Sequence, residues 1–204
     1  MLKSFDIAVL SPGVPLDIPL VEKMKVLSMT IWGEIELAYV LGKGHVVAIT
    51  GTNGKTTTTT LVGQIMARHF AHVAVVGNIG IPYTSVAEET TDDTVVVAEI
   101  SSFQLETIDT FAPKAAALLN ITPDHLNRHH TMANYIAAKE SIVKNQTRDD
   151  LCVLNYNDEV LRAFGKTLEQ KVVLFSSTET LDAGLYLQEN EILWARNGKT
   201  EHII

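Results

Sequence analysis

The sequence predicts an α/β fold, a mostly parallel sheet with helices on both faces. Short apolar runs alternate with helix-length segments along most of the chain, which is the rhythm of a doubly wound sheet. Several runs are continuously apolar instead of alternating, as expected of parallel strands covered on both faces. The predicted strands are Ile7–Leu10, Val46–Thr50, Val73–Val76, Val95–Ile100, Ala115–Leu119, Leu151–Leu154 and Val172–Phe175.

The first 43 residues predict a small leading unit. The strand Ile7–Leu10 is followed by "SPGVP", a short helix and a second strand near Val26–Met29. This unit is too short to bury a core of its own. The glycine-rich segment Leu41–His45 is typical of a linker, so we expect two domains, residues 1–43 and residues 44–204.

Three segments in the main part have the length and pattern of helices, namely Thr56–Phe70, Met132–Gln146 and Asp158–Phe164. They lie between predicted strands, as the crossover helices of a parallel sheet do. The last stretch, "GLYLQENEILWARNGKTEHII", predicts hairpin structure with turns at Glu189–Asn190 and Asn197–Gly198. Residue pairs such as Asn-Gly adopt the tight turns that join antiparallel strands.

Composition excludes several function classes. The net charge of −8 argues against a nucleic-acid-binding surface, since phosphate backbones recruit basic patches. The single cysteine, Cys152, excludes an internal disulfide and lies among apolar neighbours, so we expect an unreactive thiol and a cytoplasmic protein. No apolar run reaches the roughly 18 residues that a membrane span needs, and the N-terminus lacks a secretory signal.

The stretch "VVAITGTNGKTTTTTLVG" predicts a phosphate-binding loop. A strand leads through Gly51–Thr56 into a helix, whose N-terminal N–H groups and dipole favour an anion. Lys55 can reach the outer phosphates, and the Thr56 hydroxyl can ligate Mg²⁺. The loop is two residues shorter between its glycines than the usual pattern, with Ile49 in the place of the earlier glycine. A plain strand-to-helix turn is the alternative, and the Lys-Thr pair in this context disfavours it.

Other polar residues follow the next strands. Glu99 ends an apolar run, and a buried carboxylate is costly unless it is paired or coordinates a metal. It is therefore either a Mg²⁺ ligand or half of an ion pair at the strand end. The loop "NITPDHLNRHH" places Asp124 beside the first of three histidines. We expect His125 to face the ligand, and His129 or His130 to be solvated or to support it from behind.

Lys139 interrupts the apolar face of the predicted helix Met132–Gln146. It shares that face with Tyr135, Ile142 and Val143, at helical spacing. One interpretation is a buried stem with its ammonium in water. The other is a desolvated lysine with a lowered pKa, whose neutral amine can react with carbon dioxide and become a carbamate that bridges metal ions.

Five motifs, "GTNGKTTTT", "GNIGIP", "EISSFQLE", "NITPDHLNRH" and "YIAAKESI", occur in the order and spacing of the Mur ligases. The chain resembles this family of ATP-dependent amide ligases of peptidoglycan precursor synthesis. "SSFQLE" and "GNIG" are most similar to the members that add D-glutamate to UDP-N-acetylmuramoyl-L-alanine. The resemblance implies the P-loop-type ATP-binding central domain of Mur ligases, preceded by the end of a UDP-binding Rossmann-like domain.

The resemblance also implies roles for individual residues. Those that would bind the phosphates of ATP are Gly51, Thr52, Asn53, Gly54, Lys55, Thr56 and Thr57. The implied metal ligands for Mg²⁺ are Thr56, Glu99, His125 and Lys139, the last as N6-carboxylysine, and the implied catalytic residues are Lys55, His125 and Lys139. Gly13 and Asn78 would face the diphosphate of the UDP-sugar, and the acceptor channel would be lined by Ser101, Ser102 and Gln104.

The implied reaction has two steps. The alanyl carboxylate attacks the γ-phosphate of ATP and forms an acyl phosphate and ADP. The amine of D-glutamate then attacks the acyl phosphate, and phosphate leaves. Such an enzyme would be a monomer without nucleic-acid or membrane partners, and Lys55 would neutralise charge on the transferring phosphoryl group.

Two departures from the family pattern affect these expectations. Asn127 stands where the family commonly has Asp, which removes a carboxylate beside the proposed ligands. The chain also lacks the segment that carries the adenine contacts and the C-terminal domain, so we expect a fragment that is inactive alone. Two alternatives remain: a stand-alone P-loop nucleotide-binding module, or a sister ligase such as folylpolyglutamate synthase or the diaminopimelate-adding enzyme.

Overall fold

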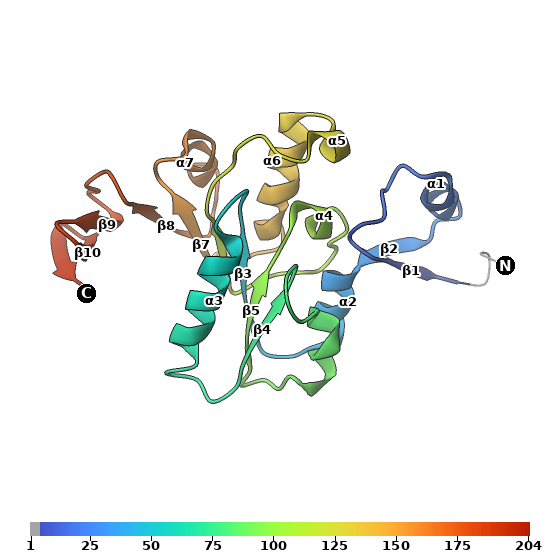
Figure 1. Ribbon diagram of the computed structural model, residues 1–204, viewed down its shortest axis with the longest axis horizontal. Helices are drawn as coiled ribbons and strands as arrows, with labels where there is room; N and C mark the ends of the chain where they lie inside the picture. The colour runs from blue at the N-terminus through green and yellow to red at the C-terminus, as the bar shows by residue number, and fades with distance from the viewer. Residues whose placement is uncertain (1–4) are drawn as a thin grey trace.

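A computed structural model describes residues 5–204 and shows the predicted α/β architecture (Figure 1). Nine strands form one sheet in the order β11-β10-β9-β8-β7-β6-β3-β5-β4, and all pairs from β4 to β9 are parallel. The parallel strands are β3 His45–Thr50, β4 Val73–Gly77, β5 Val95–Glu99, β6 Ala115–Leu118, β7 Leu151–Asn155, β8 Lys171–Ser176 and β9 Gly184–Gln188. The first six match predicted strands to within one residue at either end.

Helices cover both faces of this sheet. On one face Val47, Ile49 and Val97 pack with Val62 and Met66 of α3 (Lys55–Met66). The opposite face carries the larger core, in which Ala48, Val96 and Leu118 are buried against the other helices. Those helices include α2 Glu34–Leu41, α6 Met132–Glu140 and α7 Glu159–Gly165. The predicted helix Thr56–Phe70 corresponds to α3, which ends at Met66, earlier than expected.

Short helical segments complete the main body. They are the α-helices α4 Ser102–Leu105 and α5 Leu126–His129, and the 3₁₀ turns η2 Tyr83–Ser85, η3 Ala87–Glu89 and η4 Ser141–Val143. The predicted helix Met132–Gln146 is realised as α6 followed by η4. Cys152 is fully buried, which raises the pKa of its thiol to about 12 and confirms the expected inert cysteine.

The leading unit differs from the prediction. Its second strand, β2, spans Thr30–Gly33 and pairs in parallel with β1 (Ile7–Leu10). The prediction of a strand near Val26–Met29 was wrong, because Val26 ends the helix α1 (Pro19–Val26), which a proline starts and two lysines close. The two strands form a separate sheet at the blue end of the ribbon in Figure 1.

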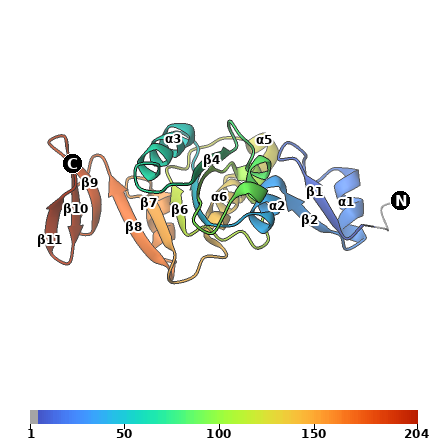
Figure 2. The ribbon, with the colours of Figure 1, turned by 90° about the horizontal axis from the view of Figure 1, so that it is seen from below.

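The C-terminal strands form the predicted hairpins. β10 (Glu191–Arg196) pairs antiparallel with β9 on one side and with β11 (Lys199–His202) on the other, and the three strands form the far end of the sheet (Figure 2). Backbone φ is positive at Glu189 and Asn190 and again at Asn197 and Gly198, as the tight turns that match strand twist require. No helix of the described residues is long and apolar enough to cross a membrane.

Candidate functional site

The candidate site lies where the central strands end. β6, β3 and β5 are neighbours in the sheet and run in the same direction. The segments that follow them, which begin at Gly51, Ile100 and Leu119, therefore meet at one edge of the sheet. Crevices beyond the carboxyl ends of parallel strands are where ligands bind in such folds.

The loop after β3 has the backbone of an anion site. Gly54 precedes α3 with φ of 81°, a left-handed conformation that glycine adopts without strain. The Lys55 ammonium donates to the Thr52 carbonyl at 2.9 Å and is thus held over the loop. Thr56 and Thr57 are exposed on the first turn of α3. Their hydroxyls and the helix N-terminus are accessible to a phosphate and its metal ion.

Asn120, two residues after the end of β6, holds this loop in place through hydrogen bonds. Its amide oxygen accepts from the Asn53 N–H at 2.8 Å, and its amide nitrogen donates to the Asn53 carbonyl at 3.0 Å. The backbone also contributes, since the Thr52 N–H donates to the Asn120 carbonyl. On the other side the Thr52 hydroxyl lies 3.0 Å from the Tyr135 hydroxyl. We had expected no such role for Asn120 or Tyr135.

Lys139 points into this loop from α6. The residue is 2% exposed, and its ammonium donates to the Gly51 carbonyl at 2.7 Å and lies 4.9 Å above the Tyr135 ring. Burial, with a smaller contribution from the Lys55 charge, lowers its pKa to about 7. The burial of Lys139 supports the desolvated interpretation over a side chain that extends its ammonium into water.

Glu99 is a buried carboxylate at the end of β5. It is 2% exposed, and its side chain accepts one hydrogen bond, 3.0 Å from the Asn78 amide, among the described residues. Gly77 of β4 lies beside Glu99 of β5. A Cβ at Gly77 would lie 2.1 Å from the Glu99 carbonyl oxygen, so only glycine lets β4 and β5 approach so closely. No ion pair involves Glu99 within residues 5–204, so the predicted alternative of a strand-end pair is wrong.

His125 is half-exposed at the start of α5. Its φ of 52° is left-handed, and its ring lies 3.4 Å from the Asp124 carboxylate. No group of three or more His, Cys, Asp and Glu side chains in the described part of the chain is arranged to hold a metal. Of the side chains expected as ligands, the Thr56 hydroxyl and the Glu99 carboxylate are oxygen donors of the type that Mg²⁺ sites use with phosphate oxygens and water, whereas the His125 ring offers a nitrogen donor.

The residues expected to line an acceptor channel make hydrogen bonds within the protein. Ser101 and Gln104 form a reciprocal capping box at the start of α4, and Gln104 is buried. Ser102 is 2% exposed, with its hydroxyl 2.9 Å from Nε2 of His129. In this arrangement only Ser101 is partly exposed.

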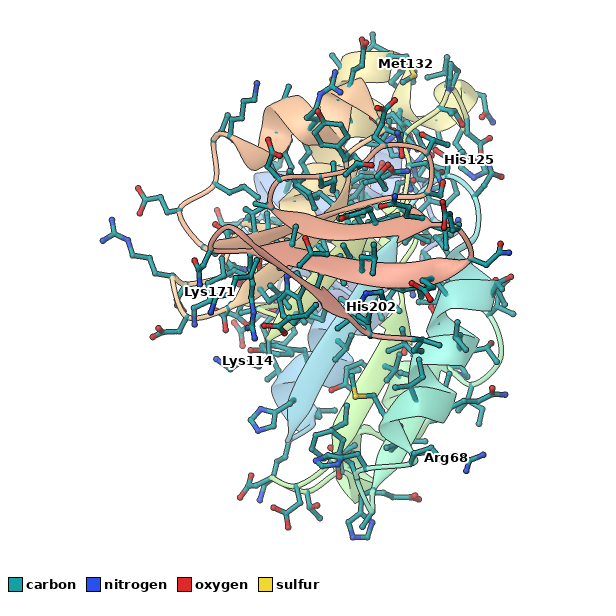
Figure 3. The ribbon with its side chains drawn as sticks, turned by 90° about the vertical axis from the view of Figure 1, so that its left-hand side faces the viewer. Arg68, Lys114, His125, Met132, Lys171 and His202 are labelled. Atoms are coloured by element: carbon teal, nitrogen blue, oxygen red, sulfur yellow. The ribbon has the colours of Figure 1, made fainter. Side chains whose placement is uncertain are left out.

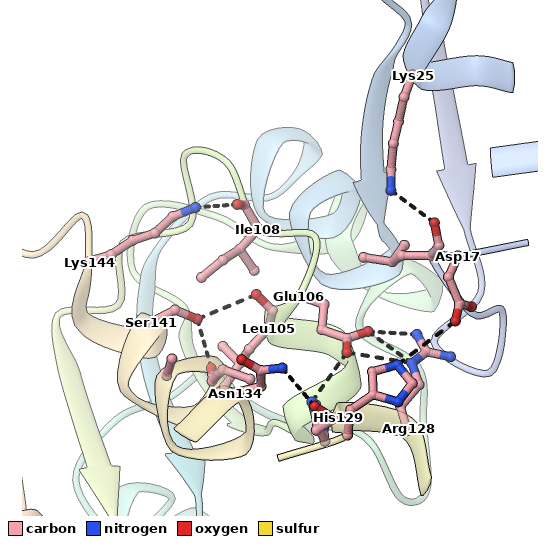
Figure 4. Close-up of a pocket in the computed structure, with 14 residues that line it drawn as sticks. Asp17, Lys25, Leu105, Glu106, Ile108, Arg128, His129, Asn134, Ser141 and Lys144 are labelled. Atoms are coloured by element: carbon pink, nitrogen blue, oxygen red, sulfur yellow. Dashed lines mark hydrogen bonds and ion pairs between the residues drawn. The ribbon is translucent and has the colours of Figure 1, made fainter. Parts of the chain in front are cut away.

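His129 is buried and His130 is exposed, which agrees with the expectation that one of these two histidines would be solvated. Nδ1 of His129 lies 3.4 Å from the Glu106 carboxylate, which also accepts hydrogen bonds from Nε and Nη2 of Arg128 (Figure 4). Desolvation lowers the pKa of His129, while the charge of Glu106 acts in the opposite direction. The cluster ties α4 to α5.

Gly13 lies in the loop after β1, across from α5. It is exposed and lines a cavity of about 420 Å³ with Phe103, Asn127 and Arg128. Asn78, which was expected to act with it, is exposed at the end of β4 and does not line that cavity. The structure thus brings Gly51 and Lys55 of the phosphate loop close to Lys139, whereas Gly13 and Asn78 do not share a cavity.

Comparison with known proteins adds the family. Residues 49–201 match the model of the Mur ligase middle domain. A UDP-N-acetylmuramoylalanine–D-glutamate ligase of Lachnoclostridium phytofermentans is 55% identical over 199 residues, which are 97% of this chain and 44% of that protein. A ligase of the same name from Clostridioides difficile is 51% identical over 189 residues, which are 92% of this chain and 42% of that protein. The chain thus spans less than half the length of these relatives.

Solved structures share the fold. A UDP-N-acetylmuramate:L-alanyl-gamma-D-glutamyl-meso-diaminopimelate ligase from Neisseria meningitides aligns with a TM-score of 0.63 at 17% identity, over 96% of this chain and 66% of that chain. The MurF ligase from Thermotoga maritima, in complex with ADP, aligns with a TM-score of 0.58 at 17% identity, over 98% of this chain and 58% of that chain. With a family match that covers three quarters of its residues, this chain belongs to the Mur ligase family.

Proposed function

We propose that this chain is the ATP-binding part of a ligase that adds D-glutamate to UDP-N-acetylmuramoyl-L-alanine in peptidoglycan precursor synthesis. The two relatives described above carry the name of that activity and align with nearly the whole chain. The observation that carries the proposal is the position of Lys139, buried, with its ammonium on the Gly51 carbonyl of the phosphate loop. A stand-alone nucleotide switch has no use for a desolvated lysine at this point.

ATP would bind with its phosphates on Gly51–Thr57. The N–H groups at the start of α3 and the Lys55 ammonium would hold the outer phosphates. Lys55 already lies over the loop, since the Thr52 carbonyl accepts its hydrogen bond. It would therefore need no large movement to neutralise charge as the phosphoryl group passes to the alanyl carboxylate.

Mg²⁺, when bound, would polarise the phosphoryl oxygens. The residues proposed to hold it are Thr56 and Glu99 through oxygen atoms and His125 through a ring nitrogen, with Lys139 as a fourth ligand if it becomes N6-carboxylysine. The carboxyl edge of the sheet supplies the needed buried acid: Glu99 accepts only the Asn78 amide among the described residues. Carbamate formation would convert the Lys139 cation beside Lys55 into an anion, which removes a like-charge repulsion.

The acceptor substrate would approach from the side of Gly13, Asn78 and Ser101, with Ser102 and Gln104 supporting Ser101 through α4. We further propose the division into residues 1–43, as the end of a UDP-binding domain, and residues 44–204, as the central ATP-binding domain. The helix α2 joins the two, since it begins beside β2 and its Ile35 and Ala38 lie in the main core. The cytoplasm, where the nucleotide substrates are made, is the proposed location.

Two experiments test this proposal. Calorimetry with ATP and Mg²⁺ should show binding to the chain, weakened about 10-fold to 100-fold by Lys55→Met, because a charge-assisted hydrogen bond to phosphate is lost. Lys23→Met, on the exposed surface of α1, is the matched control. In the second experiment, residues 1–204 replace the equivalent segment of the Clostridioides difficile relative.

That chimaera should release ADP only when both UDP-N-acetylmuramoyl-L-alanine and D-glutamate are present. The 204-residue chain alone should show no turnover. ATP binding with ADP release that ignores D-glutamate, or that follows another amino acid, would reject the assigned reaction while leaving the phosphate site intact. Absence of ATP binding in both proteins would reject the phosphate site itself.

A further inference from the structure

A second cavity lies at the other end of the sheet. It has a volume of about 570 Å³, is open to solvent, and is lined by residues of α7, β8 and the β9–β10 hairpin. Figure 3 shows the molecule from this end, with β11 and its His202 toward the viewer. The volume of this cavity is in the range of small-molecule sites. None of the residues assigned above to ATP, metal or acceptor substrate lines it.

The charged residues that line this cavity are all basic. They are Arg162 and Lys166 of the α7 region and Arg196 of β10, and no Asp or Glu is among the lining residues. This is unusual in a chain with a net charge of −8. Such a concentration of one sign attracts a ligand of the opposite sign. The cavity therefore favours an anion.

Two aromatic rings supply flat surfaces beside these charges. The Arg162 guanidinium lies 5.0 Å from the centre of the Tyr156 ring, and the Arg196 guanidinium lies 4.7 Å from the centre of the Trp194 ring. Stacking of this kind keeps a guanidinium in place while its N–H groups stay available. The rings come from different elements, Tyr156 from the end of β7 and Trp194 from β10.

The acidic partners of the two arginines lie outside the cavity. Glu159 is 4.0 Å from Arg162 and its side chain is 89% exposed, whereas Glu201 is 3.2 Å from Arg196 and its side chain is 48% exposed. Exposed pairs of this kind are weak and screened by salt. A ligand anion can therefore compete for either arginine. Lys166 has no ion-pair partner among the described residues.

We propose that this cavity binds a small planar anion, an aromatic ring that carries a phosphate or a carboxylate. The ring would pack beside Val172, Leu174 and Trp194, which are among the residues that line the cavity. The anionic group would pair with Arg162 and Lys166, from the α7 side. This site is separate from the phosphate loop and would remain if the proposed ligase activity were wrong.

Trp194 makes the proposal measurable, because the chain has two tryptophans and the other is Trp32. In a Trp32→Phe background, Trp194 fluorescence is followed during titration with phenyl phosphate and, separately, with benzoate. Inorganic phosphate and phenol serve as controls for charge without ring and ring without charge. Saturable quenching is expected with at least one of the two aromatic anions, and the arm that saturates identifies the anionic group.

Variants then locate the site. Arg162→Met, which removes a proposed ion pair, and Arg196→Met, which removes the positive charge beside Trp194, should each weaken the binding about tenfold. Arg148→Met, whose arginine is exposed and pairs with Glu169 outside the cavity, is the matched control and should leave it unchanged. Lys166→Met repeats the test if either arginine variant fails to fold by circular dichroism. Lys55→Met should also bind normally.

The proposal is overturned if neither aromatic anion saturates. It is equally overturned if inorganic phosphate quenches as strongly as phenyl phosphate, or if Arg148→Met weakens binding as much as the cavity variants. Loss of binding in Lys55→Met would show that the fluorescence change reports the phosphate loop instead of this cavity.

Discussion

At the scale of single residues, the unusual charge is Lys139. Its ammonium lies among Tyr135, the Gly51 carbonyl and the nearby Lys55 charge. The pKa is depressed from 10.5 to about 7. Between these values the unfolded state binds the extra proton, so the contribution of Lys139 to folding stability improves as pH rises across that window and is least favourable below pH 7.

Because its pKa is low, we expect the neutral amine of Lys139 to react with carbon dioxide near neutral pH. At fixed dissolved CO₂, the rate of carbamate formation on Lys139 should rise with pH to half its maximum near pH 7, since only the neutral amine reacts. ¹³C NMR after incubation with ¹³C-bicarbonate measures it. Lys139→Met should remove the signal, whereas Lys23→Met should not. A carbamate signal that persists in Lys139→Met would contradict the assignment.

The sequence could indicate Lys139, because helical spacing placed it on an apolar face. It could not indicate which residues, distant in the sequence, meet at the candidate site. Asn120 and Asn53 are 67 residues apart, and Ser102 and His129 are 27 apart. Such pairs form only because β3 and β6 are neighbours and because α4 and α5 pack at one edge. His129 resembles a surface residue in the sequence for the same reason.

At the scale of elements, the phosphate loop depends on β6. Asn120→Asp keeps the oxygen that accepts from the Asn53 N–H and replaces the amide that donates to the Asn53 carbonyl. It also adds negative charge next to the proposed phosphates. We expect ATP affinity to fall about tenfold or more, by calorimetry, from a lost hydrogen bond plus repulsion.

The matched control is Gln64→Glu, which adds the same charge on the exposed side of α3. It should change ATP affinity by less than about twofold, because the charge is exposed and screened. Equal losses in both variants would mean that net charge, and not the Asn120 contacts, sets the affinity.

The close approach of β4 and β5 gives a second prediction at this scale. Gly77→Ala would place a Cβ 2.1 Å from the Glu99 carbonyl oxygen at φ of 117°, so the strands must separate. Unfolding by urea should show a loss of about 3 kcal/mol or more. Gly80→Ala, with φ of 87° and no atom within 4 Å, meets only backbone strain and should lose about 1 kcal/mol. Similar losses would contradict a steric cause.

The strands of the main sheet were predictable because buried parallel strands are continuous apolar runs. The turn at Asn197–Gly198 was predictable because Asn-Gly favours the tight turns of hairpins. The segment "TIWG" of β2 has neither signal, and α1 carries apolar residues at its end, so the second strand was misplaced. The role of α2 was also hidden. Its buried Glu36 accepts hydrogen bonds from the backbone N–H groups of Asp109, Thr110 and Phe111, a contact over more than 70 residues.

At the scale of the whole molecule, several polar contacts join the leading unit of β1, α1 and β2 to the main body. Arg128 makes one of them: its guanidinium donates to the Val14 carbonyl at 3.0 Å and to Glu106 at 2.6 Å, and it lies 5.1 Å from the centre of the Phe103 ring. Its side chain is 14% exposed. A hydrogen-bonded pair so far from water contributes more than a surface pair does.

Arg128→Met should therefore loosen the leading unit without unfolding the main sheet. Hydrogen exchange followed by mass spectrometry should show about tenfold faster exchange in β1 and β2, since local opening becomes easier by on the order of 1.4 kcal/mol. Exchange in β3 and β5, which lie in the central sheet, should stay unchanged. Arg148→Met, which removes an exposed arginine paired with Glu169, should alter neither region. Faster exchange throughout the sheet would mean that Arg128 supports the main core, and unchanged exchange in β1 would mean that other contacts hold the unit.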